Sequence, residues 1–227
     1  MSSPQNAITA SSCWNCSAAT GSAHFCPVCG KIQPLQPGSD YFSFFGQPRK
    51  LWFEMDGLEE NFLQLSWKLH PDNFMNASDR ERELSLELTS QLNDARRVLR
   101  DPVARVEYLL ELEGARKEGE HKQQVPPELL EEVFELNESL DELREAKNAG
   151  GDLSSLRTGH EAAQARFHGQ LREVDSELQI AAEQWDAAVD ADASVSDRDA
   201  IMIRLNELLN RRSYIRNLVN SVRQELL

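Results

Sequence analysis

The sequence predicts an all-α protein preceded by a small metal-binding segment. Leu, Glu, Ala and Arg are abundant after residue 56, and these residues favour helices. Apolar side chains recur there every three or four positions, which is the spacing of one helix face. All four cysteines stand before residue 30. We therefore expect a tetracysteine segment with its linker over residues 1–39, a helical hairpin over 40–114 and a three-helix bundle over 115–227.

Two C-x-x-C pairs, Cys13 with Cys16 and Cys26 with Cys29, characterise the first segment. Each pair can hold a metal within one turn, and two pairs supply the four thiolates of a tetrahedral zinc site. Cysteines gathered in one short segment of an otherwise cysteine-free chain favour a metal over disulfides. We expect structural zinc, whose binding would supply the folding free energy that this core-poor segment lacks. Iron held by the same thiolates is the alternative, redox cysteines are a weaker one, and His24 is not expected to be a ligand.

Two amphipathic helices joined by a short polar loop form the hairpin segment. The first helix ends before His70, because Pro71 disfavours helix at the residue before it, and the second ends at Asp101-Pro102. Helices joined this closely fold back on each other, so His70, Pro71 and Asp72 should lie at the hairpin tip. Short helices are expected on either side, at 40–46 and 105–112. The expected apolar stripes are Leu58, Phe62, Leu65 and Leu69, and then Leu84, Leu88, Leu92, Ala95 and Leu99.

Three longer helices with heptad-like apolar spacing form the last segment. Proline is favoured in the first turn of a helix, so Pro126-Pro127 marks the start of the first one, and Gly150-Gly151 marks its end. Ser196-x-x-Asp199 has the pattern of a capping box at the start of the third. Three such stripes predict a three-helix bundle with near-parallel axes. The stripes are Leu129, Val133, Leu136, Leu140 and Leu143; Phe167, Leu171, Val174, Leu178, Ala181 and Trp185; and Ile201, Leu205, Leu208, Arg212, Ile215, Val219, Val222 and Leu226.

The chain is acidic, with 24 Lys and Arg against 38 Asp and Glu and a formal net charge of −14. Nucleic acids and anionic membrane surfaces are polyanions, so this balance disfavours both as partners. No apolar run approaches the roughly 20 residues that span a bilayer, and the N-terminus has neither a signal-peptide core nor an Arg-rich transit pattern. We expect a cytoplasmic protein, and the sequence leaves weak self-association open.

Several short motifs of the hairpin segment occur together in a known family. They are Asp40-Tyr41-Phe42, Leu69-His70-Pro71-Asp72-x-Phe74, Asn93-x-Ala95 and Asp101-Pro102-x-x-Arg105-x-Glu107-Tyr108-Leu109-Leu110. With these motifs the chain resembles the HscB family of iron–sulfur cluster co-chaperones, and residues 40–114 resemble a J-domain. The cysteine segment is similar to the zinc-binding extension of some members.

This resemblance implies a role for the residues at the hairpin tip. In J-domains the His-Pro-Asp tripeptide docks on a DnaK-type chaperone and triggers ATP hydrolysis, which assigns chaperone binding to His70, Pro71 and Asp72. The family also uses basic residues on the preceding helix. Here that helix offers Lys68 alone, together with the acidic residues Glu54, Asp56, Glu59 and Glu60.

The first bundle helix offers a second candidate surface. Leu130 and Phe134 are left over once the internal stripe is assigned, and residues four apart are adjacent on a helix. Acidic residues surround them, which is typical of apolar anchors with a charged rim, although a broad buried stripe would give the same spacing. In the HscB family this face binds the iron–sulfur scaffold protein, which implies that role for Leu130, Glu131, Phe134, Glu135 and Glu138.

We expect a co-chaperone, not an enzyme, whose J-domain stimulates a chaperone ATPase while its bundle binds the scaffold protein as client. A J-domain protein with a different client is one alternative. A zinc-ribbon regulator with a coiled-coil tail is another, and the near absence of Lys and Arg in residues 1–39 argues against it. Among the remaining residues, we expect Trp52, Trp67 and Trp185 to pack in cores, and His121, His160 and His168 to be solvated.

Overall fold

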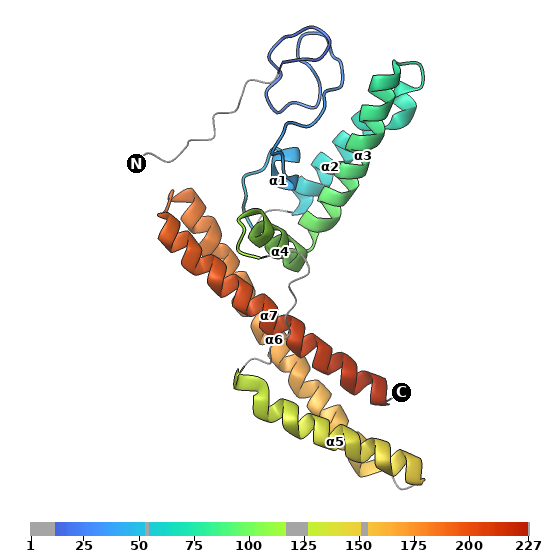
Figure 1. The fold of residues 1–227 in the computed structure, drawn as a ribbon, viewed down its shortest axis with the longest axis vertical. Helices are drawn as coiled ribbons and strands as arrows, with labels where there is room; N and C mark the ends of the chain where they lie inside the picture. Colours follow the sequence, from blue (N-terminus) through green and yellow to red (C-terminus); the bar gives the residue numbers. More distant parts are fainter. Residues whose placement is uncertain (1–11, 53–54, 117–126, 151–153, 227) are drawn as a thin grey trace. The chain divides into compact units, whose positions relative to one another are not determined.

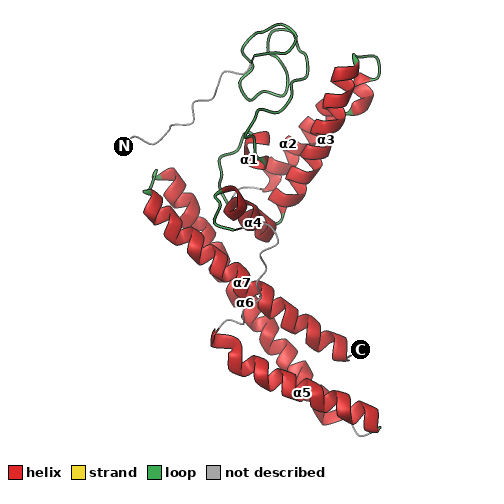
Figure 2. Ribbon diagram, in the orientation of Figure 1, coloured by secondary structure: helices red, strands yellow, loops and turns green. Residues whose placement is uncertain are grey.

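The computed structural model describes residues 12–52, 55–116, 127–150 and 154–226. In this part of the chain the regular elements are helices, and β-structure is limited to two isolated bridges, Ser12–Ala19 and Phe25–Ile32 (Figures 1 and 2). The all-α prediction is confirmed. The α-helices are α1 (Tyr41–Phe44), α2 (Met55–Leu69), α3 (Asp79–Arg100), α4 (Pro102–Leu112), α5 (Leu130–Ala149), α6 (Ser154–Asp190) and α7 (Val195–Leu226), and the 3-10 helices are η1 (Pro71–Phe74) and η2 (Pro127–Leu129).

The chain divides into two compact units, Met1–Arg105 and Val106–Leu227. The first unit contains the cysteine segment and the helices α1 to α3, and the second contains the long helices α5, α6 and α7. The finer division at residues 39 and 114 stays a prediction. None of the helices in the described residues has both the length and the apolar character of a membrane span.

In the first unit, α2 and α3 form the predicted antiparallel hairpin with η1 between them (Figure 1). Ser78 precedes α3, and both its N–H and its hydroxyl donate to the Glu81 carboxylate, an arrangement that stabilises a helix start. Asp101 accepts the N–H groups of Val103 and Ala104 at the start of α4, directly after α3 ends. The buried apolar residues of the hairpin are Leu58 and Leu69 from α2, and Leu84, Leu88, Leu92, Ala95 and Leu99 from α3.

In the second unit, α6 and α7 run side by side in opposite directions, and α5 packs against the first part of α6 (Figure 1). Gln170 of α6 donates to the Glu132 carboxylate of α5 at 3.0 Å, and Arg212 of α7 lies 2.5 Å from Asp175 of α6. The predicted three-helix arrangement is confirmed. Its buried residues include Leu136, Leu140 and Leu143; Phe167, Val174, Leu178, Ala181 and Trp185; and Leu205, Leu208, Ile215, Val219 and Val222.

One histidine differs from expectation. His160 is buried, not solvated: its Nδ1 lies 2.7 Å from a backbone carbonyl one turn earlier in α6, and its Nε2 lies 3.4 Å from the Ser139 hydroxyl of α5. It stands seven residues before the buried Phe167, so it occupies the internal face of α6. His168 is exposed as expected, and His121 lies outside the described residues.

Two tryptophans also differ from expectation. Trp185 is buried, as predicted, but Trp52 and Trp67 are exposed. Trp67 lies two residues before the buried Leu69, and at about 100° per residue it therefore points away from the internal face of α2. Its exposure leaves a large aromatic side chain at the surface beside the hairpin tip.

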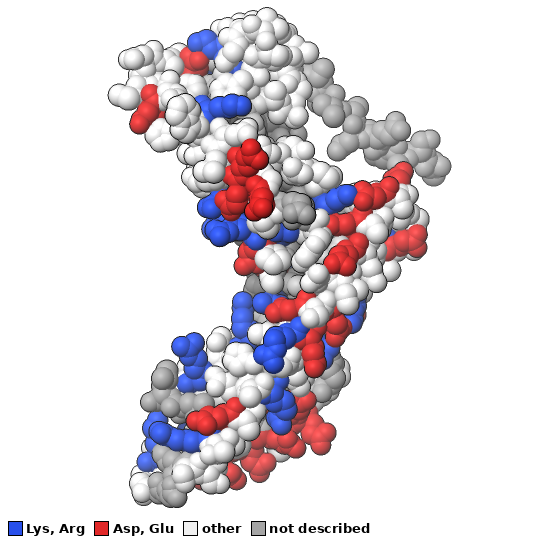
Figure 3. Space-filling model, turned by 180° about the vertical axis from the view of Figure 1, so that it is seen from behind, with Lys and Arg blue, Asp and Glu red and all other residues white. Residues whose placement is uncertain are grey.

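Charged side chains are unevenly distributed along the chain. Residues 12–39 contain one Lys and no Arg, Asp or Glu, so the cysteine segment is nearly uncharged. The helices carry acidic and basic side chains interspersed with one another (Figure 3). Among the described residues, the face shown in Figure 3 therefore has no large surface area with charges of a single sign.

Candidate functional site

Each cysteine pair stands on a tight turn, and the two turns share one backbone pattern. The carbonyl of the first cysteine accepts an N–H bond from the residue four positions later, Ser17 after Cys13 and Gly30 after Cys26, both at 2.9 Å. Ser17 and Gly30 have φ angles of 60° and 70°. An isolated β-bridge flanks each turn. The repeated geometry brings the two pairs of thiols together.

The four cysteine sulfurs form one compact cluster. All lie within 4.8 Å of one another, with 3.6 Å between the sulfurs of Cys13 and Cys29 and 3.6 Å between those of Cys16 and Cys26. A tetrahedral site with Zn–S bonds near 2.3 Å places its sulfurs about 3.8 Å apart. The cysteines are free thiols rather than disulfides. The chain therefore offers a donor set of the right kind and spacing to hold a tetrahedral metal ion.

The thiols of the cluster shift one another's pKa values in both directions. Desolvation raises the pKa of Cys13, but the backbone N–H groups of Cys16 and Asn15, with neighbouring thiols, outweigh it and lower that pKa to about 6. The Ala18 N–H lowers the pKa of Cys16, but burial and the other three cysteines outweigh it and raise that pKa to about 12. The cluster therefore holds a thiolate readily, whereas ionisation of all four thiols is favoured by a bound cation.

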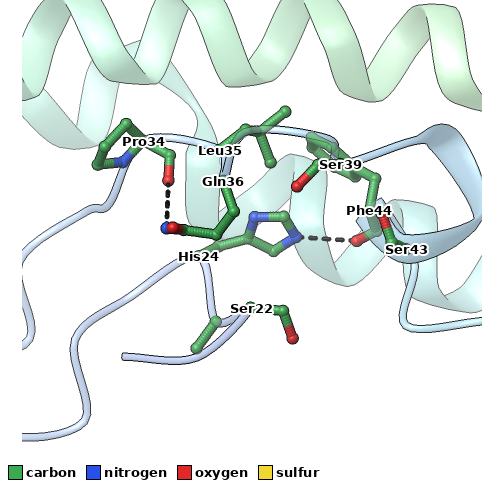
Figure 4. A pocket seen from close by; sticks show the side chains of 9 residues that line it. Ser22, His24, Pro34, Leu35, Gln36, Ser39, Ser43 and Phe44 are labelled. Carbon is green, nitrogen blue, oxygen red and sulfur yellow. Dashed lines mark hydrogen bonds between the residues drawn. The ribbon is translucent and has the colours of Figure 1, made fainter. Parts of the chain in front are cut away.

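The cysteine segment packs on the helices of its unit through His24 (Figure 4). Its Nε2 donates to the Phe44 carbonyl at 2.9 Å, and the two ring centroids are 4.5 Å apart. Desolvation lowers the pKa of His24 by more than the bond to Phe44 raises it, so the ring is neutral near neutral pH. His24 contacts α1 and is not a member of the cysteine cluster, as expected.

Two further contacts join the cysteine segment to the start of α3. Lys31 Nζ lies 2.8 Å from the Glu81 carboxylate, and the Arg80 guanidinium lies 4.8 Å from the centre of the Trp14 ring. The bond from Lys31 lowers the pKa of Glu81. These residues were not predicted from the sequence, because partners 50 or more positions apart leave no local pattern.

His70, Pro71 and Asp72 lie where α2 ends and η1 begins, at the hairpin tip. Pro71 occupies the first turn of η1, where its fixed φ is favoured. The backbone N–H of Asp72 donates to His70 Nδ1 at 3.3 Å. Because the side chains of His70 and Asp72 are exposed, the loop presents an imidazole and a carboxylate to solvent.

Two hydroxyl groups of α3 hold this loop in place. Ser85 and Thr89 both donate to the Leu69 carbonyl, at 2.6 and 3.1 Å. Leu69 and Phe74, which flank the tripeptide, are buried. The loop is therefore anchored on both sides, which limits the conformational freedom that it would lose on binding a partner.

The charges of α2 are partly neutralised by α3. Glu59 lies 2.8 Å from Arg96 Nη2 and 3.6 Å from Arg100 Nε. Lys68 is the one base between Met55 and Leu69, and its side chain is exposed beside the loop. The structure thus leaves a single cationic side chain on this helix next to His70.

Leu130 and Phe134 lie on the outer surface of α5, where they are 54% and 71% exposed. This exposure rules out the broad buried stripe, since the core of α5 consists of Leu136, Leu140 and Leu143. The acidic side chains around the two residues are exposed as well. We call this surface the α5 patch; it comprises Leu130, Glu131, Phe134, Glu135 and Glu138.

An exposed His-Pro-Asp loop on an antiparallel helical hairpin, followed by a helical bundle, defines a J-domain protein of the co-chaperone class. The co-chaperone protein HscB homolog of Vibrio cholerae serotype O1 is 36% identical over 153 residues, which cover 66% of this chain and 85% of that protein. The homolog of Photobacterium profundum is 31% identical over 171 residues, which cover 74% and 96% of the two chains. This chain belongs to the HscB co-chaperone family.

Solved structures agree with this assignment at the level of the fold. The crystal structure of human co-chaperone protein HscB superposes with a TM-score of 0.65 at 24% identity and covers 94% of this chain and 98% of its own. Chaperone HscB from Vibrio cholerae gives a TM-score of 0.55 at 25% identity, with 82% and 96% coverage. No family model matches the chain.

Proposed function

We propose that this protein stimulates the ATPase of a DnaK-type chaperone and delivers an iron–sulfur cluster scaffold protein to it during cluster assembly and transfer. The observation that carries the proposal is the anchored, exposed loop His70-Pro71-Asp72. Membership of the HscB co-chaperone family supports it. In this account the protein makes and breaks no covalent bond and acts by binding two partners.

The loop offers a partner one donor and one acceptor in a fixed order. Because His70 Nδ1 accepts the Asp72 amide, the neutral imidazole carries its proton on Nε2, which is then the donor available to a partner. The exposed Asp72 carboxylate supplies the acceptor. Pro71 restricts the backbone between them, and Lys68 adds a positive charge two residues before His70.

Stimulation of the ATPase follows if the loop binds the hydrolysis-competent state of the chaperone more tightly than its other state. A ligand shifts a conformational equilibrium only by its difference in affinity for the two states. Rigid presentation raises the affinity of the loop for the state that it binds, because little of the binding free energy is needed to order it.

The α5 patch is the proposed binding surface for the scaffold protein. Two large apolar side chains, Leu130 and Phe134, stand one turn apart on the helix, and Glu131, Glu135 and Glu138 form an acidic rim. Apolar anchors within a polar rim are typical of protein interfaces. A scaffold held here would reach the chaperone at a high effective concentration, because the same chain also binds the chaperone.

The metal proposed for the cysteine cluster is zinc, held by Cys13, Cys16, Cys26 and Cys29. With its four coordination positions filled by thiolates, zinc would have a structural role and would join the two cysteine turns. Metal analysis of the purified chain distinguishes zinc from iron, and about one equivalent per chain is expected for either ion.

Steady-state ATPase of a DnaK-type chaperone tests the loop assignment. Wild-type protein should stimulate hydrolysis, and His70→Gln should abolish stimulation because it removes the imidazole. Met75→Ala is the matched control, since Met75 is an exposed side chain directly after η1 and has no assigned role. Stimulation by His70→Gln equal to that by wild-type protein would contradict the proposal.

A further inference from the structure

Both cysteine turns contact the start of α3. Trp14 follows Cys13 in the first turn, and the Arg80 guanidinium lies 4.8 Å from the centre of its ring. Lys31 follows the second turn, and its ammonium nitrogen lies 2.8 Å from the Glu81 carboxylate. Two neighbouring side chains of α3 are therefore held by two different turns. Both contacts form together only when the two turns are fixed relative to each other.

The order of the two turns depends on the metal. Among the described residues of the cysteine segment, 12–39, the buried ones are Cys13, Thr20, Cys26, Ile32 and Gln33. Ile32 is the one large aliphatic side chain in this set. A core of this size does not offset the conformational entropy that the segment loses when it becomes ordered. Coordination by four thiolates supplies the missing free energy and joins the turns.

A stripe of polar side chains on α3 leads from the cysteine segment to the loop. Glu81, Ser85 and Thr89 are spaced four residues apart, which places them along one face of the helix. Glu81 binds Lys31. Ser85 and Thr89 both donate to the Leu69 carbonyl, which directly precedes the loop. One face of α3 therefore holds the cysteine segment at its start and the loop one to two turns further along.

The start of α3 is an element whose order both contacts favour. Helix ends open locally at a smaller free energy than the whole unit. When the first two turns of α3 are ordered, Glu81 is in place to bind Lys31, and Ser85 is in place to hold the Leu69 carbonyl. When these turns fray, both contacts are lost. A ligand that needs either contact shifts the same equilibrium towards the ordered state.

We propose that metal binding by the four cysteines and chaperone binding by His70-Pro71-Asp72 are thermodynamically coupled through the start of α3. This inference rests on the proposed function, because the DnaK-type chaperone is the partner assigned to the loop. Coupling between two binding sites is reciprocal, so the metal raises the affinity for the chaperone by the same factor as the chaperone raises the affinity for the metal. The cysteine segment thereby regulates how tightly the loop is bound.

The test compares zinc-loaded with zinc-free full-length protein, the latter stripped by a chelator that is then removed by dialysis. In a titration into a DnaK-type chaperone, removal of zinc should raise the half-saturating concentration for ATPase stimulation about fivefold. This factor is at the low end for coupled sites, because the contacts of Lys31 and Arg80 are partly solvated. The maximal rate at saturation should stay the same, because saturating chaperone itself selects the ordered helix start.

The reciprocal measurement does not use the ATPase rate. Competition with a chromophoric chelator gives the zinc dissociation constant of the chain in the same buffer and nucleotide, with and without saturating chaperone. The chaperone should lower this dissociation constant about fivefold, the factor found in the titration. Unequal factors in the two measurements would contradict a coupling of equilibrium affinities.

A double variant of α3 tests the route of the coupling. Arg80→Ala with Glu81→Gln removes the charges that contact the cysteine segment and keeps the four thiols. Glutamine at this position still completes the capping box, so the helix start is retained. Zinc should still bind, but both coupling factors should fall to about one. Glu83→Gln with Arg97→Ala, which changes exposed side chains of the same helix, is the matched control and should keep the coupling of wild-type protein.

Hydrogen exchange reports the order of the helix start directly. The Arg82 amide donates to the Ser78 carbonyl at 3.0 Å, so it is protected when the first turn is formed. In wild-type protein this amide should exchange about fivefold faster without zinc than with it. In the Arg80 and Glu81 double variant it should exchange at the same rate in both forms.

The outcomes separate this inference from the proposed function. If zinc-loaded protein stimulates the ATPase and zinc-free protein has the same half-saturating concentration, the coupling is absent and the loop assignment stands. If the coupling survives in the double variant, the cysteine segment contacts the chaperone directly and the route through α3 is wrong. Loss of helical circular dichroism on removal of zinc would also overturn the inference, because the metal would then hold the whole unit. If zinc-loaded protein fails to stimulate, the proposed function fails and the inference fails with it.

Discussion

Lys31 of the cysteine segment contacts Glu81 in the first turn of α3, with 2.8 Å between the ammonium nitrogen and a carboxylate oxygen. Glu81 is buried and also accepts both the N–H and the hydroxyl of Ser78. One turn further along α3, Ser85 holds the Leu69 carbonyl next to the loop. The cysteine segment is thus attached to the helix that supports His70-Pro71-Asp72.

The ion pair should contribute measurably to stability. In a double-mutant cycle with Lys31→Met and Glu81→Gln, we expect a coupling free energy of about 0.5–1 kcal/mol in hydrogen exchange of the Arg82 amide, which donates to the Ser78 carbonyl at the start of α3. The value stays modest because Lys31 is partly solvated. Glu83→Gln, which changes an exposed acid of the same helix, is the control and should show no coupling to Lys31.

The same coupling should depend on pH in a defined direction. Lys31 holds the pKa of Glu81 below its ordinary value, so the folded state favours the charged carboxylate. The stabilisation is therefore present above the unfolded pKa of about 4.3 and is lost as the pH falls through the folded pKa. A Lys31–Glu81 coupling free energy that is the same at neutral pH and at a pH well below the unfolded pKa of about 4.3 would contradict this account.

Zinc binding should weaken as the pH falls. Every thiol whose pKa lies above the working pH must lose a proton when the metal binds, and the pKa of Cys16 is raised to about 12 in the metal-free cluster. The apparent dissociation constant should therefore rise at least about tenfold for each pH unit between about 8 and about 6. Competition with a chromophoric chelator, corrected for the chelator's own titration, measures this dissociation constant. A dissociation constant that does not change over this pH range would count against coordination by the four thiols.

The α5 patch should matter for scaffold binding and not for folding. We expect the double change Leu130→Ala, Phe134→Ala to raise the dissociation constant for the scaffold protein about 100-fold or more in calorimetry, because two apolar anchors are removed. Its effect on the unfolding free energy should remain within about 0.5 kcal/mol, as for other exposed positions. Ile203→Ala on α7 is an equally exposed apolar control. Unchanged affinity of the double variant would place the scaffold elsewhere.

The buried face of α5 should behave in the opposite way. Leu140→Ala leaves a cavity beneath α5, so hydrogen exchange of the α5 amides should report a loss of about 2–5 kcal/mol of local stability. Phe134→Ala, on the exposed face of the same helix, is the matched control. Similar protection in the two variants would mean that α5 is not held by its apolar stripe.

Local patterns were sufficient to predict the helices and the metal cluster. The stripe from Leu84 to Leu99 and the following Pro102 define α3 because helix periodicity and proline geometry act within a few residues. The spacing of the cysteines predicted one metal cluster, because the two members of each C-x-x-C pair are only three positions apart and both pairs lie in one short segment. The contact between Lys31 and Glu81 was not predictable, because it depends on how two distant segments pack.

Some errors came from signals that were present and overlooked. His160 stands one heptad before Phe167, which already placed it on the internal face of α6. Trp67 stands about 200° from Leu69 on α2, which already placed it outside the core. Residue type outweighed position in both expectations, since histidine is usually solvated and tryptophan usually packs.

The most direct test of the two-partner account is the ATPase rate of a DnaK-type chaperone with and without the iron–sulfur scaffold protein. We predict that wild-type protein stimulates the chaperone and that scaffold increases the rate beyond the sum of the separate effects. His70→Gln should abolish both increases, and Leu130→Ala with Phe134→Ala should keep the first and lose the second. Synergy that survives in the Leu130 and Phe134 double variant, or stimulation that survives in His70→Gln, would contradict the account.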